Sequence, residues 1–436
     1  MVLICNKFII NISHSIRPVF SGLFLFFSMI SFCWSSDSSI SKIEVKGLTK
    51  TKDYIIKREI IHPLNIPLDS ILALEDRNRL FNLGLFDKVT WEFISLNDST
   101  SILQFNIIES RQSLPPIVIP SYNEELGWSL GGLFFIRNFQ GKNRTLQLNG
   151  SIGAEKKIQF MFNDPWIIGN RISLSFYLES NSFEHLFLNR TVISNRLRFD
   201  IGKKFKDKLK IRFSPMFIKK SFVNDKSRDL YKYFIPEIKI TYDSRDIYWS
   251  PKMGVNFINK FIPMIGENQF FTWDQSYSLY YPILRNRNPI VFAMNTTIKR
   301  KWGYRDDIWL NYFGNSFNIR GWHLPDSNTD YLGSEKYRFG HEYYLFSFEL
   351  RKTVTSKFLT DIGVINGINF VCFFDAGYIG QEWNDLRENS ILSGSGLGIR
   401  VPIPLIESIR VDLAWGLHNG EFKRKPVLHL ALQQKF

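Results

Sequence analysis

Arg320 is the residue in this 436-residue sequence whose surroundings most favour specific charge chemistry. It lies in NIRGW (Asn318, Ile319, Arg320, Gly321, Trp322), between stretches in which polar and apolar residues alternate. Glu349 in FELR and Asp375 in FFDAG lie on the polar faces of two later stretches. If the NIRGW segment folds toward those faces, its planar guanidinium meets both carboxylates in an arrangement that lysine could not reproduce. The alternative is a solvated loop arginine.

A second candidate is the glycine run of SGSGLGIRVPIP, in which Gly394, Gly396 and Gly398 are spaced two apart. A phosphate-binding loop needs a strand before it and a helix N-terminus after it. Here the run is followed by IRVPIPLI, whose two prolines exclude a helix. We therefore predict a strand without side chains at these three positions, against which another backbone, that of the Arg320 segment, approaches closely.

The remaining residues exclude several functional classes. The sequence contains no GxSxG or SxxK motif and no paired His–carboxylate motif on a plausible scaffold. Its seven histidines show no HExxH or HxH spacing, and only Cys372 lies outside the N-terminal leader described below. The net charge of +14 is scattered among apolar residues, as in KLKIRF, rather than gathered in a stripe. We expect no enzyme, no cofactor, no metal site and no nucleic-acid partner.

The elements that must position these residues are strands. From about residue 118 onward, polar and apolar residues alternate, for example in ISLSFYL, EIKITYD, FSFELR and RVDLAWGL. A soluble sandwich alternates too, but roughly 320 residues would be large for one such domain. Bulky aromatic residues on one face and Arg, Asp and Glu on the other fit a closed barrel with lipid outside and water inside. At about 20 residues per strand and connector, the segment makes roughly 16 antiparallel strands.

The last ten residues, VLHLALQQKF, read as the strand that closes such a barrel. The alternation places Leu428, Leu430, Leu432 and Phe436 on one face, which we predict faces lipid. An aromatic residue in the last position is also a targeting ending common among outer-membrane barrels. We predict that these four residues form the C-terminal targeting and closing segment.

The N-terminal part divides into three segments. Residues 1–36 contain the apolar run VFSGLFLFFSMISFC after Lys7 and Arg17, which is typical of a secretory signal peptide. A transmembrane anchor, the alternative, would want about 20 apolar residues. Residues 40–110 read as a small β-α-α-β-β domain, and 111–120 as a linker stiffened by three prolines. The barrel is then expected over 121–436.

A series of motifs, taken in order, resembles one superfamily: the outer-membrane insertases such as BamA and TamA, with the two-partner secretion exporters. IEVKGLTKTKDYIIKREI and RLFNLGLFDKVTW look like one POTRA domain, and GGLFFIRNFQGKNRTLQLNG is similar to the first hairpin, with Asn138 and Gly141 as its N-x-x-G element. FNDPW, YDSRDIYWSPKMG and NIRGW follow, with Trp322 in place of the family's usual Phe or Tyr. FELRKTV, FFDAGYIG and SGSGLGIRVPIP complete the order.

The resemblance implies insertion or assembly of β-barrel proteins in the bacterial outer membrane, without catalysis. The implied POTRA domain lies in the periplasm and docks clients along a strand edge. The seam between the first strand (about 126–136) and the last (427–436) would open laterally, and the Arg320 loop would tuck into the barrel. The implied partners are outer-membrane lipid, unfolded outer-membrane protein clients, and periplasmic chaperones or accessory lipoproteins. Because only one POTRA domain is visible, an exporter through the lumen and a structural barrel remain alternatives.

Overall fold

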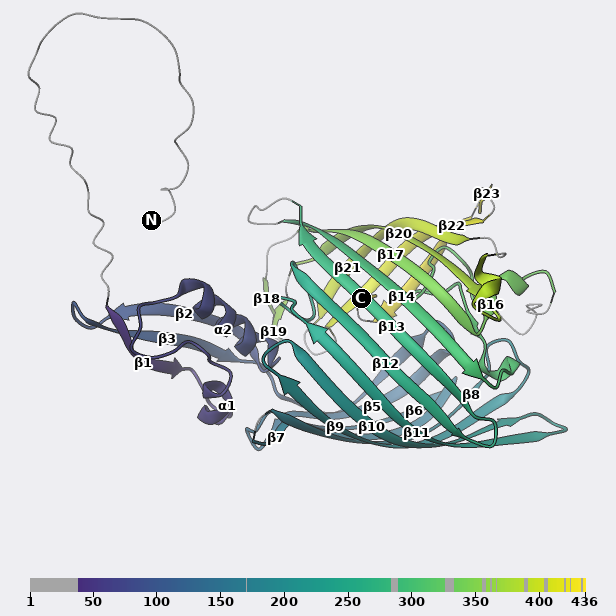
Figure 1. The fold of residues 1–436 in the computed structure, drawn as a ribbon, viewed down its shortest axis with the longest axis horizontal. Coiled ribbons are helices and arrows are strands. Elements are labelled where there is room, and N and C mark those ends of the chain that lie inside the picture. The colour runs from purple at the N-terminus through teal and green to yellow at the C-terminus, as the bar shows by residue number, and fades with distance from the viewer. Residues whose placement is uncertain are drawn as a thin grey trace, which may run out of the picture. The chain divides into compact units, whose positions relative to one another are not determined.

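The computed structural model describes residues 38–436 except 170, 284–288, 326–332, 355–357, 361–362, 366, 388–390, 404–406, 419–420, 424 and 433. The predicted signal peptide, residues 1–36, therefore lies outside the described residues. Along the described chain, a small α+β domain is followed by a β-barrel (Figure 1). None of the helices in the described ranges is long and apolar enough to cross a membrane.

The small domain has the predicted β-α-α-β-β order. Its elements are β1 (Ser39–Lys46), α1 (Asp53–Lys57), α2 (Ser70–Asn82), β2 (Phe86–Ser95) and β3 (Thr100–Glu109). The strands form one sheet in the order β1-β3-β2, in which β3 is parallel to β1 and antiparallel to β2. The helix α2 begins where the sequence provides a cap, because the Asp69 carboxylate accepts hydrogen bonds from the backbone N–H groups of Ile71 and Leu72.

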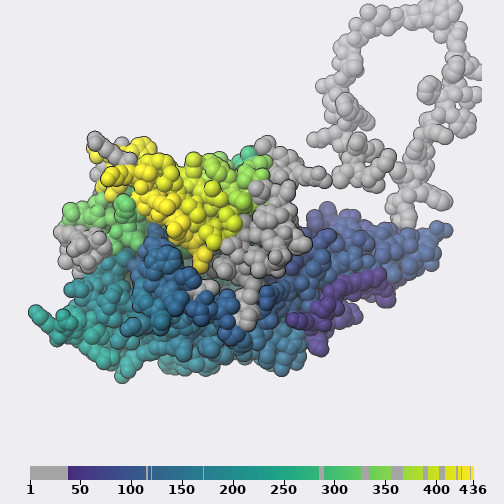
Figure 2. All heavy atoms as spheres, turned by 180° about the vertical axis from the view of Figure 1, so that it is seen from behind, coloured from purple at the N-terminus to yellow at the C-terminus, as the bar shows by residue number. Residues whose placement is uncertain are grey.

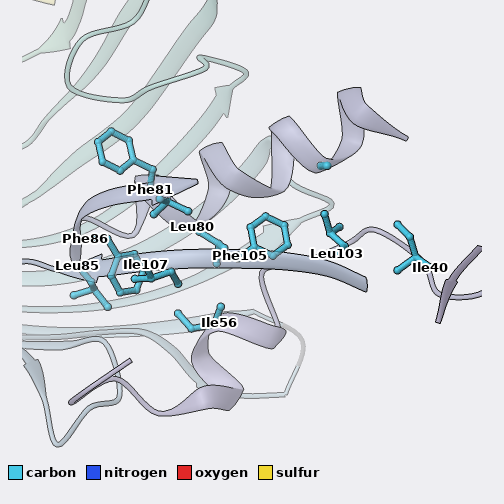
Figure 3. Close-up of a cluster of buried hydrophobic side chains, with 11 residues drawn as sticks. Ile40, Ile56, Leu80, Phe81, Leu85, Phe86, Leu103, Phe105 and Ile107 are labelled. Atoms are coloured by element: carbon cyan, nitrogen blue, oxygen red, sulfur yellow. The ribbon is translucent and has the colours of Figure 1, made fainter. Parts of the chain in front are cut away.

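One apolar core holds this domain together. Figure 3 shows side chains of α2, of β3 and of α1 converging on it, among them Leu80, Phe105 and Ile56. Each of these three side chains is fully buried. Burial of a large aliphatic or aromatic side chain contributes about 1.5–3 kcal/mol. The domain therefore has a core of its own, as the apolar face of each predicted element indicated.

Sixteen strands among the described residues close into an antiparallel barrel in which each strand pairs with its neighbours in sequence. They are β4 (Ser113–Asn123), β5 (Gly127–Phe139), β6 (Arg144–Gly153), β7 (Glu155–Ile168), β8 (Ile172–Glu184), β9 (Thr191–Phe205), β10 (Leu209–Val223), β11 (Arg228–Asp243), β12 (Gly254–Gly266), β13 (Phe270–Pro282), β14 (Ile290–Gly303), β17 (Glu342–Thr353), β20 (Asn369–Gly380), β21 (Leu392–Ile403), β22 (Glu407–His418) and β24 (Val427–Leu432). The predicted class and strand number are confirmed.

Shorter elements decorate the connections between these strands. The segment between β14 and β17 carries β15 (Asn311–Tyr312), β16 (Phe339–Gly340) and two 3-10 helices, Asp307–Trp309 and Lys336–Arg338. The other short elements are β18 (Phe358–Thr360), β19 (Gly363–Ile365), the 3-10 helix Asn384–Arg387, and β23 (Glu421–Phe422), which extends the pairing of β22.

The alternation of the sequence becomes an apolar outer surface and a polar lumen. On β10, Phe213 and Phe217 are 44% and 54% exposed on the outside, whereas Ser214 between them is buried. The same alternation on β22 leaves Leu413 on the outside and buries Asp412. Successive strand residues point to opposite faces, so period-two patterning is sufficient to specify this arrangement.

The predicted linker is wrong. Most of residues 111–120 belong to β4, the first barrel strand, which pairs with β5 from Ser113↔Ile136 to Asn123↔Gly127. The segment predicted as the first strand is β5, the second. Proline does not exclude a strand at an irregularity, and the register of β4 shifts between Leu114 and Ile117, where Pro115 and Pro116 lie. The barrel therefore closes between β4 and β24. Figure 2 shows the C-terminal strands (yellow) beside the first barrel strands (blue).

The motifs at the ends of the strands contact the small domain. Asn138 donates a hydrogen bond to the Thr51 hydroxyl over 2.9 Å, and the carbonyl of Gly141 accepts one from the Lys52 N–H over 2.9 Å. In the β11–β12 connection, Trp249 packs edge-on against Phe81 of α2, with ring centroids 4.9 Å apart. Two motifs that the sequence singled out therefore hold the small domain.

Candidate functional site

Asn318 shapes the segment that carries Arg320. Its side-chain oxygen accepts hydrogen bonds from the backbone N–H groups of Gly314 (2.8 Å) and Asn315 (3.0 Å), and its amide nitrogen donates to the Tyr312 carbonyl (2.9 Å). Side chains of this type commonly stabilise turns through such local backbone bonds. The turn brings Ile319, Arg320 and Trp322 into fully buried positions.

The structure places the Arg320 guanidinium among three carboxylates. Its Nε and Nη2 donate to the two oxygens of Asp375 over 2.7 and 3.1 Å, a bidentate contact. Its Nη1 donates to Glu349 over 2.8 Å and to Asp412 over 3.1 Å. The face of the guanidinium lies 3.4 Å from the centroid of the Phe373 ring. The inward-folded arrangement expected from the sequence is thus the one in the structure, with a third acid that the sequence analysis did not select.

Complete burial makes this arrangement energetically demanding. All four charged side chains are inaccessible to solvent. Burial alone would lower the pKa of Arg320, but Asp375 and Glu349 raise it above its usual value, so the guanidinium stays charged. A buried ion whose partner is removed costs about 3–5 kcal/mol, because its charge is left without compensation. The network therefore depends on every member being present.

Four further cations surround the same carboxylates. Arg351 donates to Glu349 over 2.8 Å, Arg400 reaches Glu349 over 3.1 Å and also bonds Asp412, and Arg410 lies 3.4 Å from Asp412. Lys435 bonds Asp375. These cations and Asp412 were not predicted from the sequence. Arg410 and Asp412 were visible on the polar face of their strand, but no motif marked them.

Glycines let the loop lie flat against the barrel wall. A Cβ built at Gly394 would be 1.8 Å from the Arg320 carbonyl oxygen, and one at Gly416 would be 2.7 Å from that of Gly321. The predicted close approach is therefore present at Gly394. At Gly396 a backbone also approaches closely, since a Cβ there would be 2.1 Å from the Leu413 carbonyl oxygen, but it is that of β22 and not of the loop. At Gly398 the neighbour is the Asp412 side chain. The glycine that completes the contact, Gly416, belongs to β22 and lies outside the run.

Trp322 fixes the end of the loop by burial. Its ring is inaccessible to solvent and belongs to an apolar cluster with Phe313, Ile319, Leu345 and other residues. Its indole N–H donates to the Ser393 carbonyl over 2.9 Å, which satisfies the one polar atom of the ring. Residues 138–436, which contain this loop and its partners, match the Omp85 superfamily domain.

The chain belongs to the Omp85 superfamily.

Comparisons with individual proteins agree with the Omp85 fold. A stretch of 99 residues, 23% of this chain, is 30% identical to the outer membrane protein assembly factor BamA of Neorickettsia risticii (strain Illinois), and spans 13% of that protein. Among solved structures, BamA from Haemophilus ducreyi lacking POTRA domains 1–3 superposes with a TM-score of 0.56 at 12% identity. The match covers 90% of this chain and 83% of the Haemophilus ducreyi chain. CdiB from Escherichia coli superposes with a TM-score of 0.59 at 12% identity. This match covers 91% of this chain and 75% of the CdiB chain.

The end of this Omp85 chain differs from the expectation at one residue. Leu428, Leu430 and Leu432 are 43–59% exposed on the outer face of β24, as predicted. Phe436, predicted to share that face, packs instead against the inward-facing residues Tyr280, Val291 and Ala293. Regular alternation stops because β24 ends at Leu432, and Lys435 turns toward Asp375.

The sequence analysis also missed a set of contacts where β24 meets the first hairpin. His429 of β24 bonds the Glu124 carboxylate of the β4–β5 turn over 2.6 Å and accepts a hydrogen bond from the Gly321 N–H over 2.9 Å. No spacing rule joins residues 305 positions apart. Among the described residues, no group of His, Cys, Asp and Glu is arranged to hold a metal.

Proposed function

We propose that this chain inserts or assembles β-barrel proteins in the bacterial outer membrane, without catalysis, through the seam between β4 and β24. The observation that carries the proposal is that the strands of the barrel pair over very different numbers of residues. The hairpin of β10 and β11 pairs over fifteen residues, whereas β24 has only six. Of the strands at the seam, β4 also contains Pro115, Pro116 and Pro120, which have no N–H to donate. Separation at β24 therefore breaks fewer hydrogen bonds than separation of a long pairing such as β10–β11.

A weak seam is suited to templating. Once separated, β4 and β24 each offer a row of unpaired backbone groups, to which a client strand can add by the same hydrogen bonds that closed the barrel. Such pairing is nearly independent of side-chain sequence, so one seam would serve many clients. The proposal needs no nucleotide, and it needs only that the seam be the pairing of lowest stability.

The small domain supports the proposal as a single POTRA domain in the periplasm. Its β2 is a sheet edge with which no other strand pairs among the described residues, apart from β3. An incoming client segment could extend the sheet along that edge. In this proposal the mature protein follows cleavage of the leader within residues 1–36. Its partners are outer-membrane lipid, unfolded clients, and periplasmic chaperones or accessory lipoproteins.

Depletion of the protein, followed by quantification of the outer-membrane proteome, tests the proposal. The expected result is loss of many barrel proteins together. Loss of one secreted protein with barrels unchanged would contradict insertion and indicate export through the lumen. An unchanged proteome would indicate a structural barrel. A direct assay would reconstitute the full chain in liposomes and follow protease resistance of an unfolded barrel client, with empty liposomes as the control.

A further inference from the structure

Three segments far apart in the sequence meet at one end of the seam. The β4–β5 turn provides Glu124 and Glu125, the Arg320 loop provides residues 312–321, and β24 provides His429. Glu124 bonds His429 over 2.6 Å with one oxygen, and its other oxygen accepts from the Ser316 N–H over 2.8 Å. One carboxylate thus bonds both the last strand and the loop.

The hydrogen bonds of His429 fix its tautomer. A backbone N–H can only donate, so the Nε2 that faces the Gly321 N–H must be the acceptor. The proton of the neutral ring is then on Nδ1, where it donates to Glu124. His429 is 1% exposed, so neither bond is readily replaced by water. The bond from Gly321 to Nε2 and the bond from Nδ1 to Glu124 therefore both depend on the same tautomer of the ring.

Glu125 provides a natural comparison, because its side-chain bonds to the described residues reach only the loop. Its carboxylate accepts from the Asn315 amide over 3.0 Å and from the Tyr312 hydroxyl. Glu124 differs in holding His429 as well. Burial would raise the pKa of Glu124, but the hydrogen bond from His429 and that from Ser316 lower it, which keeps the carboxylate ionised.

We propose that Glu124 and His429 form a latch that joins β24, the first hairpin and the Arg320 loop, so that this end of the seam opens only when the loop is released. Separation of β24 from the first hairpin breaks the Glu124–His429 bond and displaces the ring to which Gly321 is bonded. Withdrawal of the loop, conversely, leaves Nε2 of a buried histidine without a donor. Loop position and seam closure are thereby one coupled equilibrium.

Hydrogen exchange of the full chain in lipid nanodiscs, read by mass spectrometry, tests the latch. The peptides to follow are 312–322 in the loop and 427–432 in β24. In Glu124→Gln one carbonyl oxygen replaces two carboxylate oxygens, so His429 Nδ1 and the Ser316 N–H can no longer both have an acceptor, and either loss breaks the link between β24 and the loop. We expect exchange to rise about tenfold or more in both peptides, as loss of hydrogen bonds to a buried charged group implies.

The matched control is Glu125→Gln, which should raise exchange in the loop peptide and leave β24 unchanged. Equal patterns for the two variants, or an unchanged β24 in Glu124→Gln, would overturn the latch. If Glu124→Gln does not fold, as judged by heat-modifiable migration, His429→Asn replaces it, with the same two peptides expected to respond.

The role of the latch in client insertion rests on the proposed function, and the two are separable. Exchange that rises in both peptides while client insertion in liposomes is unchanged would leave the latch standing and remove its role in insertion. Wild-type protein that gives no more insertion than empty liposomes would contradict the proposed function and leave the latch standing. Exchange without coupling would remove the latch, whatever the insertion assay gives.

Discussion

Two walls of the barrel lumen have the same alternating sequence pattern, but the ion pairs on them differ in burial and therefore in their expected contribution to stability. On the wall of β17, β20 and β22, the side chains of Glu349, Asp375 and Asp412 are completely buried against the Arg320 loop. No water reaches these charges, so each depends on its partners.

On the opposite wall, formed by β9, β10 and β11, the ion pairs remain wet. Arg198 bonds Asp200 and Glu237 with a fifth of its side chain exposed, and Arg212 lies 3.7 Å from Asp200. The carboxylates of Asp200 and Glu237 are largely buried, but the arginines keep contact with water, so these pairs should contribute less than the fully buried ones. An alternating polar face therefore specifies which residues point inward, whereas the inserted loop determines which of them are buried and stabilise the fold.

Removing the central cation should separate the two walls most clearly. We expect Arg320→Ala to lower the free energy of unfolding by about 3–5 kcal/mol, because three buried carboxylates lose their shared partner. Arg212→Ala on the wet wall should cost less than about 1 kcal/mol. Urea unfolding of both variants in the same detergent measures the difference. Equal losses would show that the walls do not differ as described.

Replacing the cation without removing its charge should be nearly as damaging. Lysine in Arg320→Lys offers a point charge that cannot reach Asp375 in bidentate fashion and Glu349 at the same time. We also expect Arg320→Ala combined with Asp375→Asn to cost less than the sum of the two single changes, since both disrupt one network. Strictly additive losses in the double variant would show that the residues act independently.

The last residue provides a smaller test, at the inner face of β13 and β14. Phe436 packs against Tyr280. The guanidinium carbon of Arg351 lies 4.9 Å from the centroid of the Phe436 ring. Phe436→Ala should lower the free energy of unfolding by about 1–3 kcal/mol, from loss of partly buried apolar area. Leu432→Ala, on the outer face of β24, is the control. If Phe436→Ala responded only to a change of lipid thickness, as a lipid-facing residue would, the inward placement would be contradicted.

The smallest expected effect lies outside the barrel and depends on pH. Burial would raise the pKa of Glu109, but hydrogen bonds from Thr51, Thr49 and the Lys50 N–H lower it to about 2. Because the folded pKa lies below the usual value near 4.5, this carboxylate stabilises the fold above pH 4.5. That contribution is lost as pH falls toward 2. The melting-temperature difference between wild type and Glu109→Gln should therefore shrink over this interval, and a constant difference would contradict it.

What the sequence could predict depended on local pattern. Alternation was sufficient for the barrel. Polar parity placed Glu349 and Asp375 in the lumen but did not select Asp412, which has the same parity and also bonds Arg320. The prolines of β4 were misleading because their tolerance depends on an irregularity in register, which no local rule shows. Phe436 was misplaced because a strand pattern does not reveal where the strand ends. The Glu124–His429 bond was out of reach, since it exists only after the first and last strands meet.

The burial of Arg320 also sets an order of events in time. Its three carboxylates follow it in the chain by 29, 55 and 92 residues, so none is close to it in the sequence. Contacts of such separation form late, because chain entropy must be overcome first. We therefore expect the loop to dock only after β22 has joined the sheet, which would make its docking a late step in the assembly of the barrel.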